Sequence, residues 1–181
     1  MISRYALIPA LLAILTLTAC NGPSRSGKSG SRTQKQQGTR VEWGVDEVEQ
    51  RAKQGQAYYQ HHLAMLYRRG RGVTPSKKRA FEWEMKAANQ KYIPSYYWIG
   101  LAYLHGDGIQ LNETDAFEWL TKASEAGFPP AIRQVGKMYI NGQGVRADKR
   151  EGIRKLRAAA AAGDKEADRI LMEEHGIRVP R

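Results

Sequence analysis

The chain has 181 residues, of which 41% are hydrophobic, and its 29 Lys and Arg against 18 Asp and Glu give a formal net charge of +11. Its single cysteine, Cys20, excludes an internal disulfide, so packing of apolar surface has to supply the stability. Residues 41–181 are long enough for a modest core if several similar units pool their apolar faces.

Residues 1–19 have the features of a cleaved leader. Arg4 is their only charged side chain, and the apolar stretch is too short to span a membrane as a helix. The stretch ends in Leu17-Thr18-Ala19-Cys20. This sequence resembles the lipobox of bacterial lipoproteins, in which an apolar residue and two small ones precede a cysteine that is diacylated. The resemblance implies a lipoprotein signal peptide and lipidation of Cys20. The alternative is an ordinary secretory signal with an incidental cysteine.

The lipobox also predicts where the chain is located. Two or three acyl chains on Cys20 would anchor it stably, where a single chain would not. The next residue is Asn21. In lipoproteins an aspartate at that place tends to retain the protein in the inner membrane. We therefore expect a lipid-anchored protein of the bacterial cell envelope, on the outer membrane and facing the periplasm.

Residues 20–40 are predicted to be the lipidated cysteine followed by a flexible basic tether. Gly, Ser and Gln dominate, and no side chain there could build a core. At this length the mean reach is about 25 Å. Residues 21–40 hold five basic side chains and no acidic one. The charge can serve solubility alone, or it can give weak adhesion to anionic lipid or cell wall.

One spacing recurs three times in the next part of the chain, each time after a step of 36 residues. The three copies are Tyr67-x-x-Gly70-x-Gly72-Val73, Tyr103-x-x-Gly106-x-Gly108-Ile109 and Tyr139-x-x-Gly142-x-Gly144-Val145. A fixed step of this size is typical of a stack of similar units, each burying its apolar face against the next. We place the units at about residues 56–91, 92–127 and 128–163.

Each unit is predicted to contain two helices. In the middle unit, apolar residues recur at intervals of three and four over residues 94–105 and again over 112–126, and each run ends at a glycine. A left-handed glycine is expected to end each first helix. The second helices are expected to begin after equivalent N-caps, which are Ser76, Asn112 and Asp148.

The two ends of the array have the pattern of half-units. Trp43 to Lys53 resembles the second helix of a missing unit, and Lys165 to His175 resembles the first helix of a fourth. The sequence therefore predicts an all-α fold of about eight helices, an α/α solenoid of antiparallel helix pairs over residues 41–175. A short tail follows at residues 176–181.

The repeated pattern resembles the Sel1-like repeat, a relative of the tetratricopeptide repeat. The third unit shows this most fully, with Ala131-x-x-x-Val135-Gly136-x-x-Tyr139-x-x-Gly142-x-Gly144-Val145. The resemblance implies a right-handed superhelix. The first unit departs most, with Tyr59 in place of a small residue, Ala64 in place of Gly, and Lys91 in place of the closing Gly. Tyr59 is expected to loosen or reshape the stack.

Groups suited to catalysis or metal binding are scarce in this sequence. His61 and His62 are adjacent, so they point about 100° apart on a helix and cannot share a metal. Glu82 and Glu84 flank Trp83, and we expect both to be solvated charges. Asp107 lies between two glycines, but its equivalents in the other units are Arg71 and Gln143. We predict no enzyme activity, no catalytic residue, no metal site and no cofactor.

Charge alternates between the units. Residues 56–91 carry eight basic and two acidic side chains (+6), residues 92–127 one and five (−4), and residues 128–163 eight and two (+6). The alternation can simply let neighbouring units attract one another, or it can steer a partner of matching pattern. Nucleic acid is not expected as a partner, because the acidic unit would interrupt its track and the compartment is wrong.

The resemblance also implies where a protein partner would bind. In this family the first helix of each pair lines the concave face, so its non-core residues are the candidate contacts. These residues are Tyr58, His62, Met65, Arg69, Trp98, Leu101, His105, Gln134, Lys137 and Asn141. Trp, Tyr, Met and Arg are residues that interfaces favour.

Three functions remain open at this point. The first is a membrane-anchored protein-binding repeat protein, in particular an immunity protein that neutralises a secreted antibacterial effector such as a phospholipase, as some small Sel1-like lipoproteins do. The second is an envelope scaffold or regulator of secretion or cell-wall machinery. The third is a binder of peptidoglycan or another anionic polymer.

Overall fold

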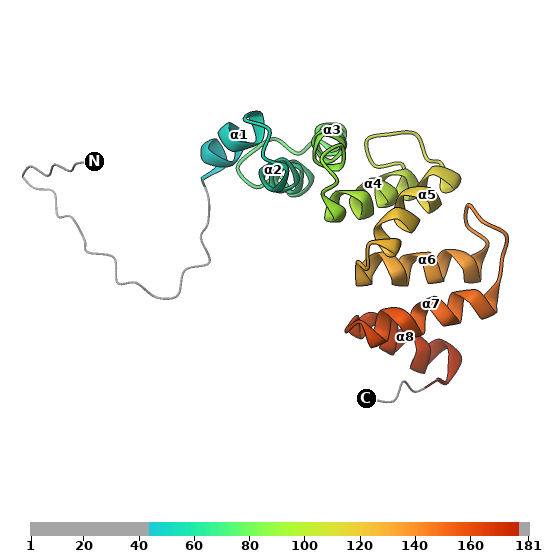
Figure 1. Cartoon of the computed structure of the whole chain (residues 1–181). Helices are drawn as coiled ribbons and strands as arrows, with labels where there is room; N and C mark the ends of the chain where they lie inside the picture. Colours follow the sequence, from blue (N-terminus) through green and yellow to red (C-terminus); the bar gives the residue numbers. More distant parts are fainter. Residues whose placement is uncertain (1–43, 178–181) are drawn as a thin grey trace, which may run out of the picture. The chain divides into compact units, whose positions relative to one another are not determined.

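The computed structural model describes residues 44–177, and these residues form helices without any strand (Figure 1). The predicted leader, the predicted lipidation site Cys20 and the predicted tether lie outside the described residues. Among the residues described, no helix is both long and apolar enough to cross a membrane. The helices are α1 (Val45–Lys53), α2 (Ala57–Arg69), α3 (Lys77–Ala88), α4 (Ile93–His105), α5 (Glu113–Glu125), α6 (Pro129–Asn141), α7 (Lys149–Ala161) and α8 (Lys165–His175).

Each of these helices packs extensively against the next one in the chain. The helices α2 with α3, α4 with α5, and α6 with α7 make the three closest pairs, and α1 and α8 extend the stack at its two ends (Figure 1). The prediction of an all-α solenoid built from helix pairs is therefore confirmed.

Local chemistry sets where the helices of each pair end and begin. The first helices end at Gly70, Gly106 and Gly142, which have φ of 66°, 70° and 69°. The second helices begin after Ser76, Asn112 and Asp148, whose side-chain oxygens accept hydrogen bonds from backbone N–H groups of the first turn, as predicted.

The loop inside each pair is closed by one repeated hydrogen bond. The N–H of the N-cap residue donates to the carbonyl oxygen of the repeated tyrosine, at 2.9 Å in the first unit, 3.0 Å in the second and 2.8 Å in the third. This bond satisfies a carbonyl group that the end of the first helix leaves free. The tyrosine therefore recurs at a fixed distance from both the glycine and the N-cap.

The second glycine of each repeated motif is the point where consecutive units meet. A Cβ atom on Gly108 would lie 2.5 Å from the carbonyl oxygen of Lys77, at the start of α3. A Cβ atom on Gly144 would collide with the carbonyl oxygen of Glu113, at the start of α5. Each loop thus packs its backbone directly onto the preceding unit, so only glycine fits there.

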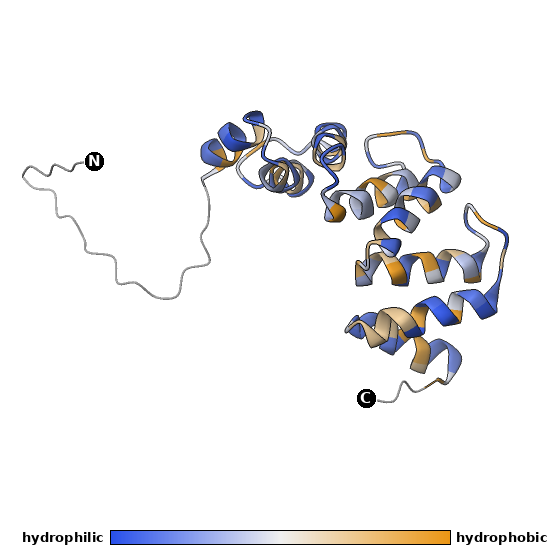
Figure 2. Ribbon diagram, viewed as in Figure 1, coloured by the Kyte–Doolittle hydropathy of each residue, from blue (hydrophilic) through white to orange (hydrophobic). Residues whose placement is uncertain are grey.

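The core repeats with the same 36-residue step. Leu63, Ile99 and Val135 are buried on the first helices, and Ala87, Ala123 and Ala159 are buried on the second helices. Figure 2 shows hydrophobic positions alternating with hydrophilic ones along the helices, as expected when one stripe of each helix faces its neighbours.

The departures in the first unit are accommodated without opening the stack. Tyr59 is buried in a hydrophobic cluster with Val48 and Leu63, and its hydroxyl oxygen accepts a hydrogen bond from Arg51 of α1. The large ring adds a polar link across the α1–α2 contact. That Tyr59 loosens or reshapes the stack stays a prediction.

Candidate protein-binding surface

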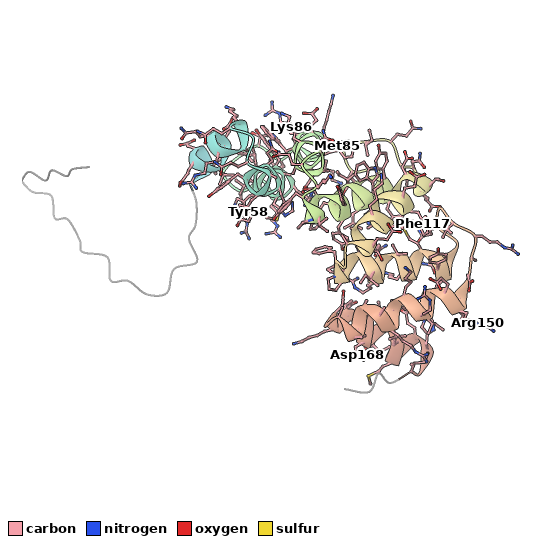
Figure 3. The ribbon with its side chains drawn as sticks, in the orientation of Figure 1. Tyr58, Met85, Lys86, Phe117, Arg150 and Asp168 are labelled. Atoms are coloured by element: carbon pink, nitrogen blue, oxygen red, sulfur yellow. The ribbon has the colours of Figure 1, made fainter. Side chains whose placement is uncertain are left out.

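The structure places the predicted contact residues on three equivalent helices. Tyr58, His62, Met65 and Arg69 lie on α2, Trp98, Leu101 and His105 on α4, and Gln134, Lys137 and Asn141 on α6. None of these ten side chains is buried. Tyr58 is 50% exposed, which is unusual for a large aromatic residue (Figure 3). The set is therefore accessible to a partner, although it does not form a single cluster.

The structure brings together two groups of the predicted contact residues. The rings of Tyr58 and His62 stack with centroids 6.2 Å apart. Burial, and then the nearby charges of His61 and Arg69, hold the pKa of His62 below its ordinary value. Trp98, Leu101 and His105 line one recess open to solvent, which we call the α3–α4 recess.

The α3–α4 recess lies where the first unit meets the second. Its walls come from α2, α3, α4 and the loop after α4. Its lining residues are Arg68, Lys77, Ala80, Phe81, Glu84, Trp98, Leu101, Ala102, His105 and Asp107. Lys77 and Asp107 form an ion pair at 2.5 Å across it, which links a basic unit to the acidic one. This ion pair is one attractive contact between neighbouring units of opposite charge.

The floor of the recess corrects one prediction from the sequence. Glu82 is exposed as expected, but Glu84 is only 1% exposed and is not a solvated charge. Glu84 lies 36 residues before Leu120 and 72 before Leu156, which are both completely buried. The prediction was wrong because it placed Glu84 by its adjacency to Trp83, whereas its place in the 36-residue step puts it in the core.

The buried carboxylate of Glu84 is fully paired. His61 Nδ1 lies 3.0 Å from Oε2 and 3.1 Å from Oε1, and Arg68 Nη2 donates to Oε1 at 3.0 Å. An ionised carboxylate only accepts hydrogen bonds, so with Glu84 ionised this geometry corresponds to the tautomer of His61 that has its N–H at Nδ1. A buried charge is tolerated when it is paired in this way.

Arg68 carries this network out to the predicted surface. Its guanidinium carbon lies 3.9 Å from the centre of the Trp98 ring, a cation–π contact between the first and second units. The Arg68 side chain is 24% exposed, so part of the guanidinium reaches solvent. Successive side-chain contacts therefore connect the buried Glu84, through Arg68, to the accessible ring of Trp98.

Sequence reasoning missed Arg68 and Glu84 as members of the site. The signal was present in the 36-residue step, because Arg68 is replaced by Leu104 and Ile140 in the other units, and Glu84 by Leu120 and Leu156. Charged residues that occur in one unit at core positions of the others indicate something other than packing.

At one set of equivalent positions, different pairs of side chains make the contact between consecutive units. The rings of His61 and Tyr92 lie 5.3 Å apart, and the rings of Tyr97 and Phe128 lie 5.5 Å apart at the next equivalent positions. In the third copy Arg133 Nε donates to Asp164 Oδ2 at 3.0 Å. Burial raises the pKa of the Tyr97 hydroxyl. These side chains hold consecutive units together, so they are structural rather than contact residues.

The third unit offers a different kind of surface on α7. Lys149, Arg150, Arg154 and Arg157 surround the apolar side chains of Ile153 and Ile177 in a second, open recess. Figure 2 shows mostly hydrophilic residues over the first half of α7, and Figure 3 labels Arg150 there. Arg154 pairs with Glu151 at 2.5 Å. This surface can attract anionic groups.

The described residues contain no group of three or more His, Cys, Asp or Glu side chains that could hold a metal ion. In the same part of the chain the charged groups of the α3–α4 recess pair with one another, as Lys77 does with Asp107 and Arg68 with Glu84. The arrangement suits binding through shape, apolar contact and charge.

Helix pairs stacked with a 36-residue step define an α/α-solenoid repeat protein. The Sel1 repeat model matches residues 57–92, 93–128 and 129–164, which together make up more than half of the chain. The chain therefore belongs to the Sel1 repeat family, whose repeats are scaffolds for protein–protein interaction. No curated protein matches the chain.

Solved structures with the same fold come from several bacteria. A protective antigen of uropathogenic Escherichia coli has a TM-score of 0.68 and 31% identity over 75% of this chain, which spans only 30% of that protein. A Sel1 repeat protein from Oxalobacter formigenes has a TM-score of 0.62 and 29% identity, over 71% of this chain and 97% of that one. An immunity protein from Pseudomonas aeruginosa has a TM-score of 0.53 and 24% identity, over 73% and 51%.

Proposed function

We propose that this chain is a membrane-anchored protein of the bacterial envelope that binds another protein through the accessible residues of α2, α4 and α6. The observation that carries the proposal is the α3–α4 recess, where Trp98, Leu101 and His105 meet the partly exposed Arg68. Aromatic and arginine side chains beside an apolar recess are typical of the residues that dominate binding energy in protein interfaces.

The proposed partner is a secreted antibacterial effector, such as a phospholipase, which makes the chain an immunity protein. The lipobox ending at Cys20 supports this, because an anchored inhibitor has a high local concentration at the membrane where such an effector acts. The fold is also one that the immunity protein from Pseudomonas aeruginosa has.

A pull-down tests the protein-binding role. The bait is the chain without residues 1–19 and with Cys20→Ser, compared with the same bait carrying His62→Ala, Trp98→Ala and Lys137→Ala together. We expect the triple variant to lose the partner. The matched control carries Lys149→Ala and Arg150→Ala on α7 and keeps it. Equal recovery by all three baits would reject the assignment of the binding surface.

Two further experiments test the finer parts of the proposal. A Cys20→Ala variant is expected to move from the membrane fraction to the soluble fraction, and an unchanged distribution would argue against lipidation of this residue. A strain lacking the gene is expected to be killed by siblings that secrete the effector. Its survival among them would remove the immunity role while leaving protein binding intact.

A second candidate function is binding of an anionic cell-wall polymer. The recess on α7 favours it, because Lys149, Arg150 and Arg157 stand there beside exposed apolar surface. Sedimentation with purified sacculi would then be sensitive to salt and would be lost with Lys149→Gln and Arg150→Gln, whereas Trp98→Ala would have little effect. A scaffold role would instead appear in the pull-down as resident envelope proteins without any effector.

A further inference from the structure

The buried carboxylate of Glu84 has no counterpart at the equivalent positions of the other two units that the structure describes. At the equivalent positions the second and third units pack Leu120 and Leu156, so the repeat folds without a carboxylate there. Replacing a buried ion pair by apolar residues is often neutral or stabilising. The network of His61, Arg68 and Glu84 is therefore not required for packing, and its effect is to fix the position of Arg68.

Arg68 is held in a way that leaves binding capacity free. Among the described residues, its hydrogen bond to Glu84 uses only Nη2, and the guanidinium plane lies over the Trp98 ring. A guanidinium has five N–H donors in a rigid fork, so other donors remain available on the exposed side. Arginine fixed in this way is well suited to bind a second carboxylate.

The other charges of the α3–α4 recess are already paired. The carboxylate of Glu84 is bound by Arg68 and His61, and the carboxylate of Asp107 is bound by Lys77. Leu101, Phe81 and Ala80 supply apolar walls. The remaining donors of Arg68 are therefore available to a ligand in this recess.

We infer that the α3–α4 recess binds an aspartate or glutamate side chain on an extended acidic segment of the partner protein, with Arg68 as the cationic contact and Trp98 as the apolar platform. The wall that α2 and α3 form supports this occupant, because it belongs to the first unit, whose net charge of +6 would attract an acidic segment, whereas the facing second unit carries −4. The inference rests on the proposed protein-binding function and adds the chemistry of the partner.

Random octapeptides displayed on phage provide the probe. They are selected on the immobilised chain lacking residues 1–19 and carrying Cys20→Ser, and binding of the enriched peptides is then measured by fluorescence anisotropy. We expect the enriched peptides to contain Asp or Glu next to an apolar residue. Changing that acidic residue to its amide is expected to weaken binding about tenfold or more, as is Arg68→Gln in the protein.

Three comparisons separate binding from folding. Arg146→Gln removes the same charge from the exposed loop between α6 and α7, outside both recesses, and is expected to leave peptide binding unchanged. Arg68→Lys keeps a cation beside Glu84 but lacks the planar fork, so it should bind peptides more weakly than the wild type while remaining folded by circular dichroism. Because Arg68 and the peptide carboxylate contact each other, removing both should cost much less than the sum of the two single changes.

The inference is overturned if no peptide is enriched, if the enriched peptides lack acidic residues, or if Arg68→Gln and Arg146→Gln affect binding equally. Its failure can be told apart from failure of the proposed function. A partner captured in the pull-down with equal efficiency by wild type and Arg68→Gln would keep the function and reject the acidic recess. Selection of acidic peptides without any captured partner would keep the acidic recess and reject the proposed function.

Discussion

Glu84 accepts a hydrogen bond from Arg68 at 3.0 Å inside the first unit, at two positions where the second unit packs Leu120 and Leu104. One fold therefore accommodates a buried ion pair and a pair of leucines in equivalent places. The leucines show that the repeat can fold without the ion pair. The ion pair therefore matters for the surface of the first unit, where Arg68 is partly exposed.

Replacing the ion network by the residues of the second unit is expected to keep or raise stability. In the variant His61→Tyr, Arg68→Leu, Glu84→Leu, the buried charge disappears together with both of its partners. We expect the free energy of unfolding to be unchanged or higher by up to about 4 kcal/mol. Glu84→Ala alone is expected to lower it by about 3 kcal/mol, because it leaves Arg68 and His61 partly buried without their carboxylate.

Urea unfolding followed by far-UV circular dichroism measures both variants. The comparison between the triple variant and the wild type is the decisive one. If the triple variant is less stable than the wild type, the ion network stabilises the unit by more than leucine packing does, and the functional interpretation of Arg68 loses its main argument.

The stability of the chain is expected to fall as His62 becomes protonated. Folding lowers the pKa of His62 below 6.5, chiefly by burial, so the unfolded chain takes up this proton more readily than the folded one. The contribution to stability is therefore complete above pH 6.5 and is lost as the pH falls from there through the lower pKa of the folded state. His62→Gln, which copies Gln134 of the third unit, removes this dependence.

The measurement is the urea midpoint at pH 8 and at pH 5 for wild type and His62→Gln. The wild type should lose more stability between the two pH values than the variant does. Equal losses would mean that other groups account for the acid sensitivity and that His62 titrates normally.

The parts of the fold that the sequence predicted well are those fixed by local chemistry. Gly106 is needed wherever a helix ends in the left-handed region, and Asn112 caps the next helix through its own side chain. Each of these choices depends on a few neighbouring residues and recurs every 36 positions. The helix boundaries were therefore accessible without the structure.

The candidate site was less predictable because its contacts join distant residues. Arg68 and Trp98 are 30 residues apart, and their contact depends on how two units stack and on which rotamer each long side chain adopts. Trp98 could be identified as an accessible first-helix residue, whereas the role of Arg68 required the burial of Glu84. Comparing the units position by position would have indicated Glu84, but not its hydrogen bonds.

Adding one methyl group at Gly100 is expected to destabilise the second unit. A Cβ atom there would lie 2.5 Å from Cγ of Leu120, a branched atom in the core that cannot move aside freely. Overpacking of this kind outweighs the gain in helix propensity, so Gly100→Ala should lower the free energy of unfolding by about 1–2 kcal/mol. Thermal and urea unfolding measure the effect.

The Leu120→Ala background provides the control for Gly100→Ala. With the leucine removed, the contact at 2.5 Å is gone and the carbonyl oxygen of Ala116 remains 3.2 Å from the added Cβ, so the alanine should then cost much less or be neutral. A loss of the same size in both backgrounds would show that the collision with Leu120 is not the cause.

Replacing Lys91 by glycine is expected to stabilise the first unit. Lys91 has a φ of 60°, and among the described residues it is the one non-glycine residue with positive φ. Its equivalents Gly55, Gly127 and Gly163 have φ of 88°, 79° and 90°. The left-handed conformation costs a side-chain-bearing residue about 1–2 kcal/mol, and the greater freedom of glycine in the unfolded chain returns about 0.4–1 kcal/mol of this. Lys91→Gly should therefore gain about 0.5–1 kcal/mol in urea unfolding.

The reverse change, Gly127→Lys, introduces no collision, because no atom lies within 4 Å of the added Cβ. It should cost a similar amount, and a gain in both variants would show that the backbone conformation does not decide the effect.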